Sequence, residues 1–144
     1  MRTRLVRDVI EGQKILCLAP TVTVSEAARR MKEQKVGSAM VVADGRLAGI
    51  FTERDALMRV LAAGLDAGAT PLSAVMTAEL VTIDQQATLM EALRLMHDGG
   101  FRHVPVVDAG RPVGIVSIRD ALGEELIRFN REVAERQELA ERLG

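Results

Sequence analysis

The same stretch of sequence occurs twice in this chain of 144 residues. Residues 22–57 align with residues 87–122 without a gap, and 15 of the 36 aligned positions are identical. The clearest part is "GIFTERDAL" at 49–57, which returns as "GIVSIRDAL" at 114–122. A duplicated segment of this length indicates one supersecondary unit that is used twice. The sequence therefore predicts two similar units of about 60 residues each.

Each unit is predicted to begin with a strand and a helix. Short apolar runs at 15–18 and 80–83 indicate buried strands. A Thr-x-x-Glu capping box follows at 23–26 and again at 88–91, and such a box opens a helix. The spacing of the apolar residues after each box is that of a helix with one buried face.

A hairpin and a second helix complete each unit. Residues 38–51 and 103–116 are predicted to form β-hairpins, with Asp-Gly at 44–45 and Ala-Gly at 109–110 as their turns. The repeated hydroxyl-x-x-Asp segment then opens the second helix, which in the first unit runs towards Gly64. The order of elements is β-α-β-β-α, twice.

A unit of so few strands can hardly bury its own apolar face. We therefore expect an α+β fold in which two such units pack face to face about a pseudo-twofold axis. The units are placed at 1–66 and 67–125, and an extended C-terminal helix is placed at 126–144. The apolar stripe of that last helix is predicted to consist of Leu122, Leu126, Phe129, Val133, Ala140 and Leu143.

The repeated hydroxyl-x-x-Asp segment allows two interpretations. Thr52 with Asp55, and Ser117 with Asp120, have the spacing of a capping box, which is a purely structural role. Free N–H groups at a helix start also attract anions, and a carboxylate there can accept two hydrogen bonds from a sugar diol. The preceding glycine, at 49 or 114, either relieves crowding in the strand or lets a ligand approach the backbone.

The sequence resembles a tandem pair of CBS domains, the cystathionine-β-synthase-type repeat, also called a Bateman module. The resemblance rests on "AVMT", on "FRHVPVVD" followed by "GRPVGIVSIRD", and on the matching "VVADGRLAGIFTERDAL" of the first half. It implies a non-catalytic regulatory module that binds an adenosine compound in the cleft between the repeats. AMP, ADP or ATP are the expected ligands, with S-adenosylmethionine or NAD as further possibilities.

The resemblance also implies which residues hold the ligand. The acidic residue and hydroxyl of each motif would hold the ribose, and strand residues would contact the adenine with help from the lead-in of the opposite repeat. One expected pocket contains Asp55, Thr52, Gly49, Ile50, Arg54, Thr77 and Val81. The other contains Asp120, Ser117, Gly114, Ile115, Arg119, Lys14 and Ile15.

The two halves differ where a strand is expected to face the cleft. The second half has Arg102 and His103, which suit phosphate, and the first half has Gly37 and Ser38 at the same positions. We therefore predict that the Asp120 pocket is the tighter, phosphate-bearing site. The arginines at the matched positions 54 and 119 either contact phosphate or form ion pairs on the solvent side.

Composition argues against several other classes of protein. Nineteen Lys and Arg against 20 Asp and Glu, with only 2% aromatic residues, predict no nucleic-acid partner. No apolar run approaches the roughly 20 residues of a membrane helix, so no membrane contact is expected. A single cysteine and the lack of an apolar leader predict a cytoplasmic protein. Cys17 itself lies in an apolar run and is expected in the core.

No nucleophile arrangement, phosphate-binding loop or zinc spacing is evident, so we expect neither an enzyme nor a metal site. A homodimer is expected, because the stripe of the last helix exceeds what one repeat can cover. A separate effector protein is a further expected partner. The alternative to a nucleotide sensor is a dimerisation scaffold with no bound nucleotide.

Overall fold

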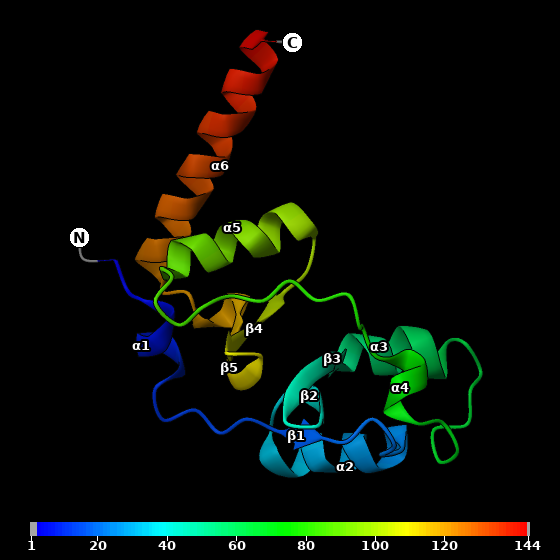
Figure 1. Cartoon of the computed structure of the whole chain (residues 1–144). Helices are drawn as coiled ribbons and strands as arrows, with labels where there is room; N and C mark the ends of the chain where they lie inside the picture. Colours follow the sequence, from blue (N-terminus) through cyan, green and yellow to red (C-terminus); the bar gives the residue numbers. More distant parts are fainter. Residues whose placement is uncertain (1–2, 144) are drawn as a thin grey trace.

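The structure, a computed structural model, describes residues 3–143, and it is built from two similar halves (Figure 1). The first half contains α1 (Val6–Ile10), β1 (Cys17–Leu18), α2 (Val24–Gln34), β2 (Ser38–Ala43), β3 (Arg46–Thr52), α3 (Glu53–Asp55) and the π-helix η1 (Ala56–Leu61). The second half contains α4 (Leu72–Val75), α5 (Leu89–Gly99), β4 (His103–Asp108), β5 (Arg111–Ser117), the 3₁₀ turn η2 (Ile118–Asp120) and α6 (Gly123–Leu143). The α+β class and the helix followed by a β-hairpin in each half are as predicted, whereas the first strand and the last helix of the units differ from the prediction.

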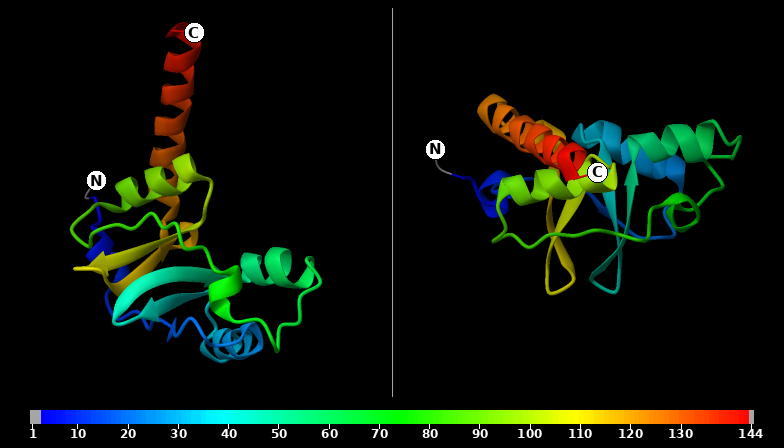
Figure 2. Two further views of the ribbon diagram at one scale, coloured as in Figure 1. Left: turned by 45° about the vertical axis from the view of Figure 1, so that its right-hand side comes forward. Right: turned by 90° about the horizontal axis from the view of Figure 1, so that it is seen from above.

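The two hairpins are nearly identical and lie side by side (Figure 2). β2 pairs with β3 and β4 pairs with β5, both antiparallel, and each pair has a bulge at the same place, after Val41 or Val106. The turns fall where the sequence placed them, with positive φ at 44–45 and 109–110. At the tips Leu47 N donates to Gly110 O at 2.9 Å, so a backbone hydrogen bond joins the two halves.

The first strand is shorter than predicted in both halves. β1 covers two residues and pairs in parallel with β2. The matching run at 80–83 forms only an isolated parallel bridge, between Ile83 and Val106. The reason is the path of the preceding segment, which first pairs with the other half through Thr77 and reaches β4 only at Ile83.

Capping explains where α2 and α5 begin. Thr88 Oγ1 accepts from Glu91 N at 3.1 Å, and the Glu91 carboxylate accepts from Thr88 N at 2.8 Å, which is the complete predicted box. Thr23 Oγ1 accepts from Glu26 N at 3.3 Å, but the Glu26 carboxylate pairs with Arg29 instead of returning to Thr23.

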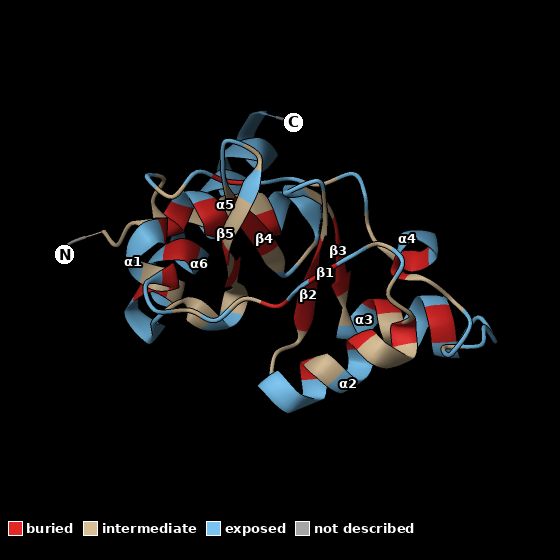
Figure 3. Ribbon diagram, turned by 60° about the horizontal axis from the view of Figure 1, so that its bottom comes forward, coloured by how far each residue is buried: buried red, intermediate tan, exposed pale blue. Residues whose placement is uncertain are grey.

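Each half receives a helix from the lead-in of the other (Figure 3). Val6 and Ile10 of α1 are buried in a core formed by α5, β4 and β5. Leu72 and Val75 of α4 are buried in a core formed by β1, α2, β2 and β3. Each hydrophobic core therefore contains residues from both of the units that were predicted from the sequence. The boundaries proposed at 66 and 125 stay predictions, and the outermost bounds at 1 and 144 lie outside the described residues.

The second helix of each half behaves differently. In the first half α3 continues directly into η1, and the chain turns at Gly64, where φ is +72°, as predicted. In the second half η2 stops at Ala121, whose backbone is extended with ψ of 133°, and α6 starts afresh at Gly123. The helix that the second hydroxyl-x-x-Asp segment was predicted to open is therefore only a 3₁₀ turn, and α6 is a separate helix that starts before the predicted position 126.

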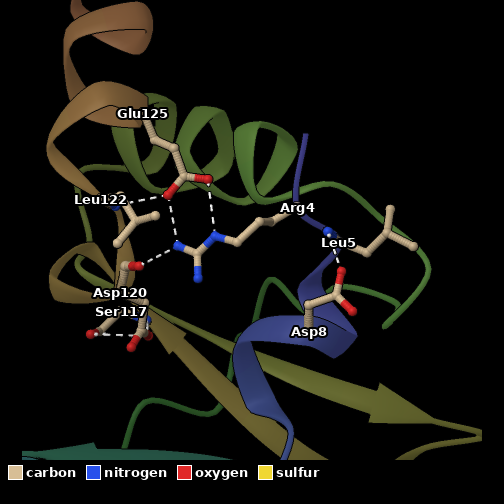
Figure 4. Close-up of polar contacts among 7 residues, drawn as sticks. All are labelled: Arg4, Leu5, Asp8, Ser117, Asp120, Leu122 and Glu125. Carbon is tan, nitrogen blue, oxygen red and sulfur yellow. Dashed lines mark hydrogen bonds and ion pairs between the residues drawn. The ribbon is translucent and has the colours of Figure 1, made fainter. Parts of the chain in front are cut away.

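Arg4 holds this break in place (Figure 4). Its guanidinium donates to the Asp120 carbonyl at 2.7 Å, the group that would otherwise accept a helical hydrogen bond. It also makes two bonds to the carboxylate of Glu125, at 3.1 and 2.7 Å, and Glu125 in turn accepts from Leu122 N at 2.8 Å. The hydrogen-bonded pair caps the start of α6 and fixes its direction.

α6 packs on α5 near its start and then projects away from both halves (Figure 1). Phe129 is buried and Val133 half-buried against α5, whereas the stripe residues Leu122, Ala140 and Leu143 are exposed. The predicted stripe is thus covered only in its middle. No helix in residues 3–143 has the length and apolar character needed to cross a bilayer.

Candidate functional site

A cavity of about 780 Å³ lies between the two halves, within the usual range for small-molecule sites. Its walls come from the end of β3 and the start of α3, from the segment after α4, and from the starts of β4 and η2. Ten of the sixteen residues predicted to bind a ligand line it: Ile50, Thr52, Arg54, Asp55, Thr77, Val81, Arg102, His103, Ser117 and Arg119.

Asp55 is a helix cap that also faces this cavity. Its Oδ2 accepts from Thr52 N at 2.9 Å and from Thr52 Oγ1 at 3.1 Å, while Asp55 N donates to the same hydroxyl at 3.2 Å. The residue is 9% exposed, and its Oδ1 lies 3.6 Å from Arg59 Nε. The structural interpretation of this motif is therefore confirmed, because one carboxylate oxygen caps the helix while the other faces Arg59, and the ribose-binding role of Asp55 stays a prediction.

The segment after α4 also lines this cavity. Thr77 pairs with Ile50 through two backbone hydrogen bonds, of 2.9 and 3.0 Å, and the chain then follows the cavity through Glu79, Leu80 and Val81. This is the placement expected for the lead-in of the opposite repeat. The lining is apolar at Ile50, Leu80 and Val81.

The two motif glycines serve the lead-ins and do not line the cavity. A Cβ on Gly49 would lie 2.5 Å from Met76 Sδ and 3.0 Å from Thr77 O. A Cβ on Gly114 would lie 2.7 Å from Ile10 Cγ2. The interpretation that they let a ligand approach was wrong, because protein atoms from the opposite lead-in already occupy that space.

The second motif is built into a different environment. Asp120 Oδ2 accepts from Ser117 N at 2.7 Å, and Asp120 does not line the cavity. The Gln13 side chain pairs with the backbone of Ile115. Gln13 Nε2 donates to Ile115 O, and Ile115 N donates to Gln13 Oε1, each at 2.9 Å. The predicted residues that lie outside the cavity are Asp120, Gly114, Ile115, Lys14, Ile15 and Gly49.

Arg102 and His103 of the second half line the cavity that Asp55 also lines. His103 is at the same time the strand partner of Ser117 in the second motif, and Asp120 acts to raise its pKa. The assignment of Arg102 and His103 to an Asp120 pocket, and the ranking of that pocket as the tighter site, therefore stay predictions.

The charges around His103 are mixed. Burial lowers the pKa of His103, and Arg119 and Arg102 lower it further, while Glu53 and Asp120 act in the opposite direction. Arg119 is exposed, and its Nη2 lies 3.3 Å from Glu53 Oε1 across the two halves. The lowered pKa therefore favours the neutral form of the His103 imidazole.

Sequence reasoning missed several lining residues. Arg59 follows Asp55 by four positions on a helix, a spacing that could have indicated the pair. No comparable local signal marks the others, which are Glu53, Met58, Gly100, Phe101, Pro105 and Ile118, whereas Glu79 and Leu80 lie within the lead-in that was predicted to line the pocket from Thr77 to Val81.

Cys17 is exposed, so its predicted place in the core was wrong. Burial alternates along this stretch, with Leu16 and Leu18 buried on either side of it. Across residues 3–143, no three His, Cys, Asp or Glu side chains gather as a metal ion would require. His97 lies on the exposed side of α5, with its ring 5.8 Å from that of Phe129.

Comparison with known proteins identifies the architecture. The family model described as "CBS domain" matches residues 6–62 and 72–126. The CBS domain-containing protein YhcV of Bacillus subtilis is 40% identical over 115 residues, covering 80% of this chain and 81% of that protein. In CBSCBSPB3 of Arabidopsis thaliana the match is 36% identical and spans 69% of this chain but 18% of that longer protein.

Solved structures agree with the fold. The CBS domain protein PAE2072 from Pyrobaculum aerophilum, complexed with AMP, has a TM-score of 0.78 at 26% identity, covering 88% of this chain and 98% of that chain. The CBS domain pair of protein MJ0100, in complex with 5′-methylthioadenosine and S-adenosyl-L-methionine, has a TM-score of 0.73 at 25% identity, covering 83% and 93%. With two matched repeats and relatives of this similarity, the chain belongs to the CBS domain family and carries two CBS domains in tandem.

Proposed function

We propose that this chain is a non-catalytic regulatory module that binds an adenosine ligand in the cavity lined by Asp55. The observation that carries the proposal is the gathering of three kinds of group in one cavity: the Thr52–Asp55 cap, the apolar lead-in at 77–81 and the cations of the second half. AMP in PAE2072 and the two adenosine compounds in MJ0100 support the ligand class.

The arrangement suggests how such a ligand would lie. Asp55 Oδ1 would accept from the ribose hydroxyls, as a carboxylate does in other nucleotide sites. The base would pack between Ile50 and the segment 77–81. The phosphate would then point towards Arg102 and Arg119 at the centre of the cleft, where charge-assisted hydrogen bonds are available.

A ligand in this position would contact both repeats at once. It would therefore favour whichever relative placement of the halves gives it the best contacts, and the shift is limited by its differential affinity for the two placements. We propose that a separate effector protein in the cytoplasm responds to this shift. AMP, ADP and ATP are the first candidates, followed by S-adenosylmethionine and NAD.

The test is titration calorimetry of these five ligands against the wild type, Asp55→Asn and Asp120→Asn. The two substitutions are matched, because each changes the same position of a capping box. We expect Asp55→Asn to weaken binding by about 30-fold or more, since it loses an anionic acceptor, and Asp120→Asn by less than about threefold. A larger loss from Asp120→Asn would overturn the assignment, and no binding by any of the five would overturn the function.

The second candidate is a dimerisation scaffold, favoured by a specific surface. Leu57, Met58 and Leu61 are between 54 and 74% exposed on the helix after Asp55. Adjacent apolar residues of this size on one helix are typical of an interface between copies. Sedimentation of wild type and Leu61→Glu tests it: a dimer that Leu61→Glu dissociates supports the interface, and a monomeric wild type excludes it.

A further inference from the structure

Two pairs of equivalent positions on the cleft side differ in chemistry between the repeats: Gly37 corresponds to Arg102, and Glu53 corresponds to Ile118. Glu53 N donates to Gly37 O at 3.0 Å, and the equivalent bond in the second half runs from Ile118 N to Arg102 O at 3.1 Å. The backbone pairing at these positions is therefore the same in both halves. The first half has an acid with a glycine partner, whereas the second half has an apolar residue with an arginine partner.

The glycine makes room for the acid. A Cβ on Gly37 would lie 2.7 Å from Glu53 Oε1 and 3.7 Å from Arg119 Nη2. Glu53 Oε1 in turn accepts from Arg119 Nη2 at 3.3 Å. A carboxylate of the first repeat thus occupies the space beside a guanidinium of the second repeat, on the wall of the cavity.

This carboxylate acts on the same region as the cations. The pKa of His103 is lowered by Arg119 and raised by Glu53, which places both charges within reach of one imidazole. Arg102 lines the cavity beside them, and Glu79 lies on the lead-in that also lines it. A phosphate in this region would lie near Arg102 and Arg119, and Arg119 is already paired with Glu53.

We propose that Glu53 sets the number of phosphate groups that the cavity accepts, favouring one over three. The inference rests on the proposed function. A single phosphate can be paired by Arg102 and Arg119. Each further phosphate brings negative charge towards Glu53 and competes with it for Arg119, and like charges a few ångströms apart repel measurably even in a wet site.

The experiment measures AMP and ATP affinities by calorimetry, without magnesium and at fixed salt, for wild type, Glu53→Gln and Glu79→Gln. Glu53→Gln removes the charge and keeps the shape. It is expected to tighten ATP binding about five- to tenfold and AMP binding less than about threefold. Glu79→Gln, a control at another acid that lines the cavity, is expected to leave the ratio of the two affinities within about twofold.

Gly37→Ala gives an independent variant that keeps every charge. Its Cβ would displace the flexible end of Glu53 and separate it from Arg119, so the ratio is expected to shift in the same direction by about two- to threefold. If binding depends on Asp55 but the ratio stays unchanged in Glu53→Gln, the role of Glu53 is overturned and the proposed function stands. If neither nucleotide binds in an Asp55-dependent way, both are overturned.

Discussion

Thr52–Asp55 and Ser117–Asp120 make the same capping box, yet they lead to different structures. After Asp55 the helix continues into η1, and Asp55 itself lines the cavity. After Asp120 the helix breaks, and Arg4 binds the carbonyl that would have continued it. A repeated motif therefore fixes the local turn, while contacts from distant residues decide whether it becomes part of a site.

The largest effect on this comparison is expected from Glu125→Gln. The substitution breaks a nearly buried bidentate pair and weakens the cap of α6, which should cost about 2 to 3 kcal/mol of unfolding free energy. Thermal unfolding should show a melting temperature lower by on the order of 5 to 10 °C. Glu124→Gln, the exposed neighbour, is the control, and equal losses in the two variants would contradict the role of the pair.

The same pair has a defined pH dependence. The Arg4 side chain holds the pKa of Glu125 below its ordinary value, assisted by the N–H of Leu122 and opposed by burial. A lowered carboxylate pKa stabilises the fold above the ordinary value of about 4.3, and this stability is lost as pH falls through the folded-state pKa. The difference in unfolding free energy between wild type and Glu125→Gln should therefore become smaller at acidic pH.

A smaller effect on unfolding free energy should distinguish the two lead-in segments, one at Gln13 and the other at Thr77. Gln13→Ala removes a side chain that pairs with the backbone of Ile115, and should cost about 1 to 2 kcal/mol. Thr77→Ala should cost less than about 0.5 kcal/mol, because the matching pair to Ile50 is made by backbone atoms. Denaturant unfolding of both variants measures the difference. Similar losses would mean that the side chain of Thr77 matters as much as that of Gln13.

The smallest effect concerns His103 and pH. Its folded-state pKa lies below the ordinary value, so the free protein should lose a little stability as pH falls below about 6.5. A bound phosphate would favour the protonated ring, so nucleotide affinity should rise over the same range, by a few-fold between about pH 7.5 and 5.5. His103→Gln should flatten both trends, as followed by unfolding and calorimetry. His97→Gln is the control, and the proposal fails if it has the same effect.

Local signals predicted much of the fold and the helix start that carries Asp55. The hairpin turns, the capping boxes and the place of Asp55 follow from residues within a few positions of one another. The break at Ala121 could not be predicted in this way, because it depends on Arg4, more than 110 positions away. Strand β1 is too short for its alternation to reveal that Cys17 is exposed.

The presence of Arg102 and His103 in the same cavity as Asp55 was also beyond the sequence. It depends on how the two repeats face each other, and two equivalent pockets would have been equally consistent with the duplication. The resemblance to CBS pairs implied that the segment 77–81 lies beside the Asp55 pocket, and Thr77 and Val81 do line the same cavity as Asp55. The resemblance gave no sign that Gln13 and Arg4 would make the second motif different.

The exchange of lead-in helices sets an order of events during synthesis. Val6 and Ile10 leave the ribosome roughly 100 residues before Val116, which belongs to the core that buries them. Until the strand of Val116 has emerged, the apolar side of α1 has no permanent place to pack, and a nascent chain is open to wrong contacts at such a stage. The core of the second repeat closes only when α1 and β5, which are far apart in the sequence, meet.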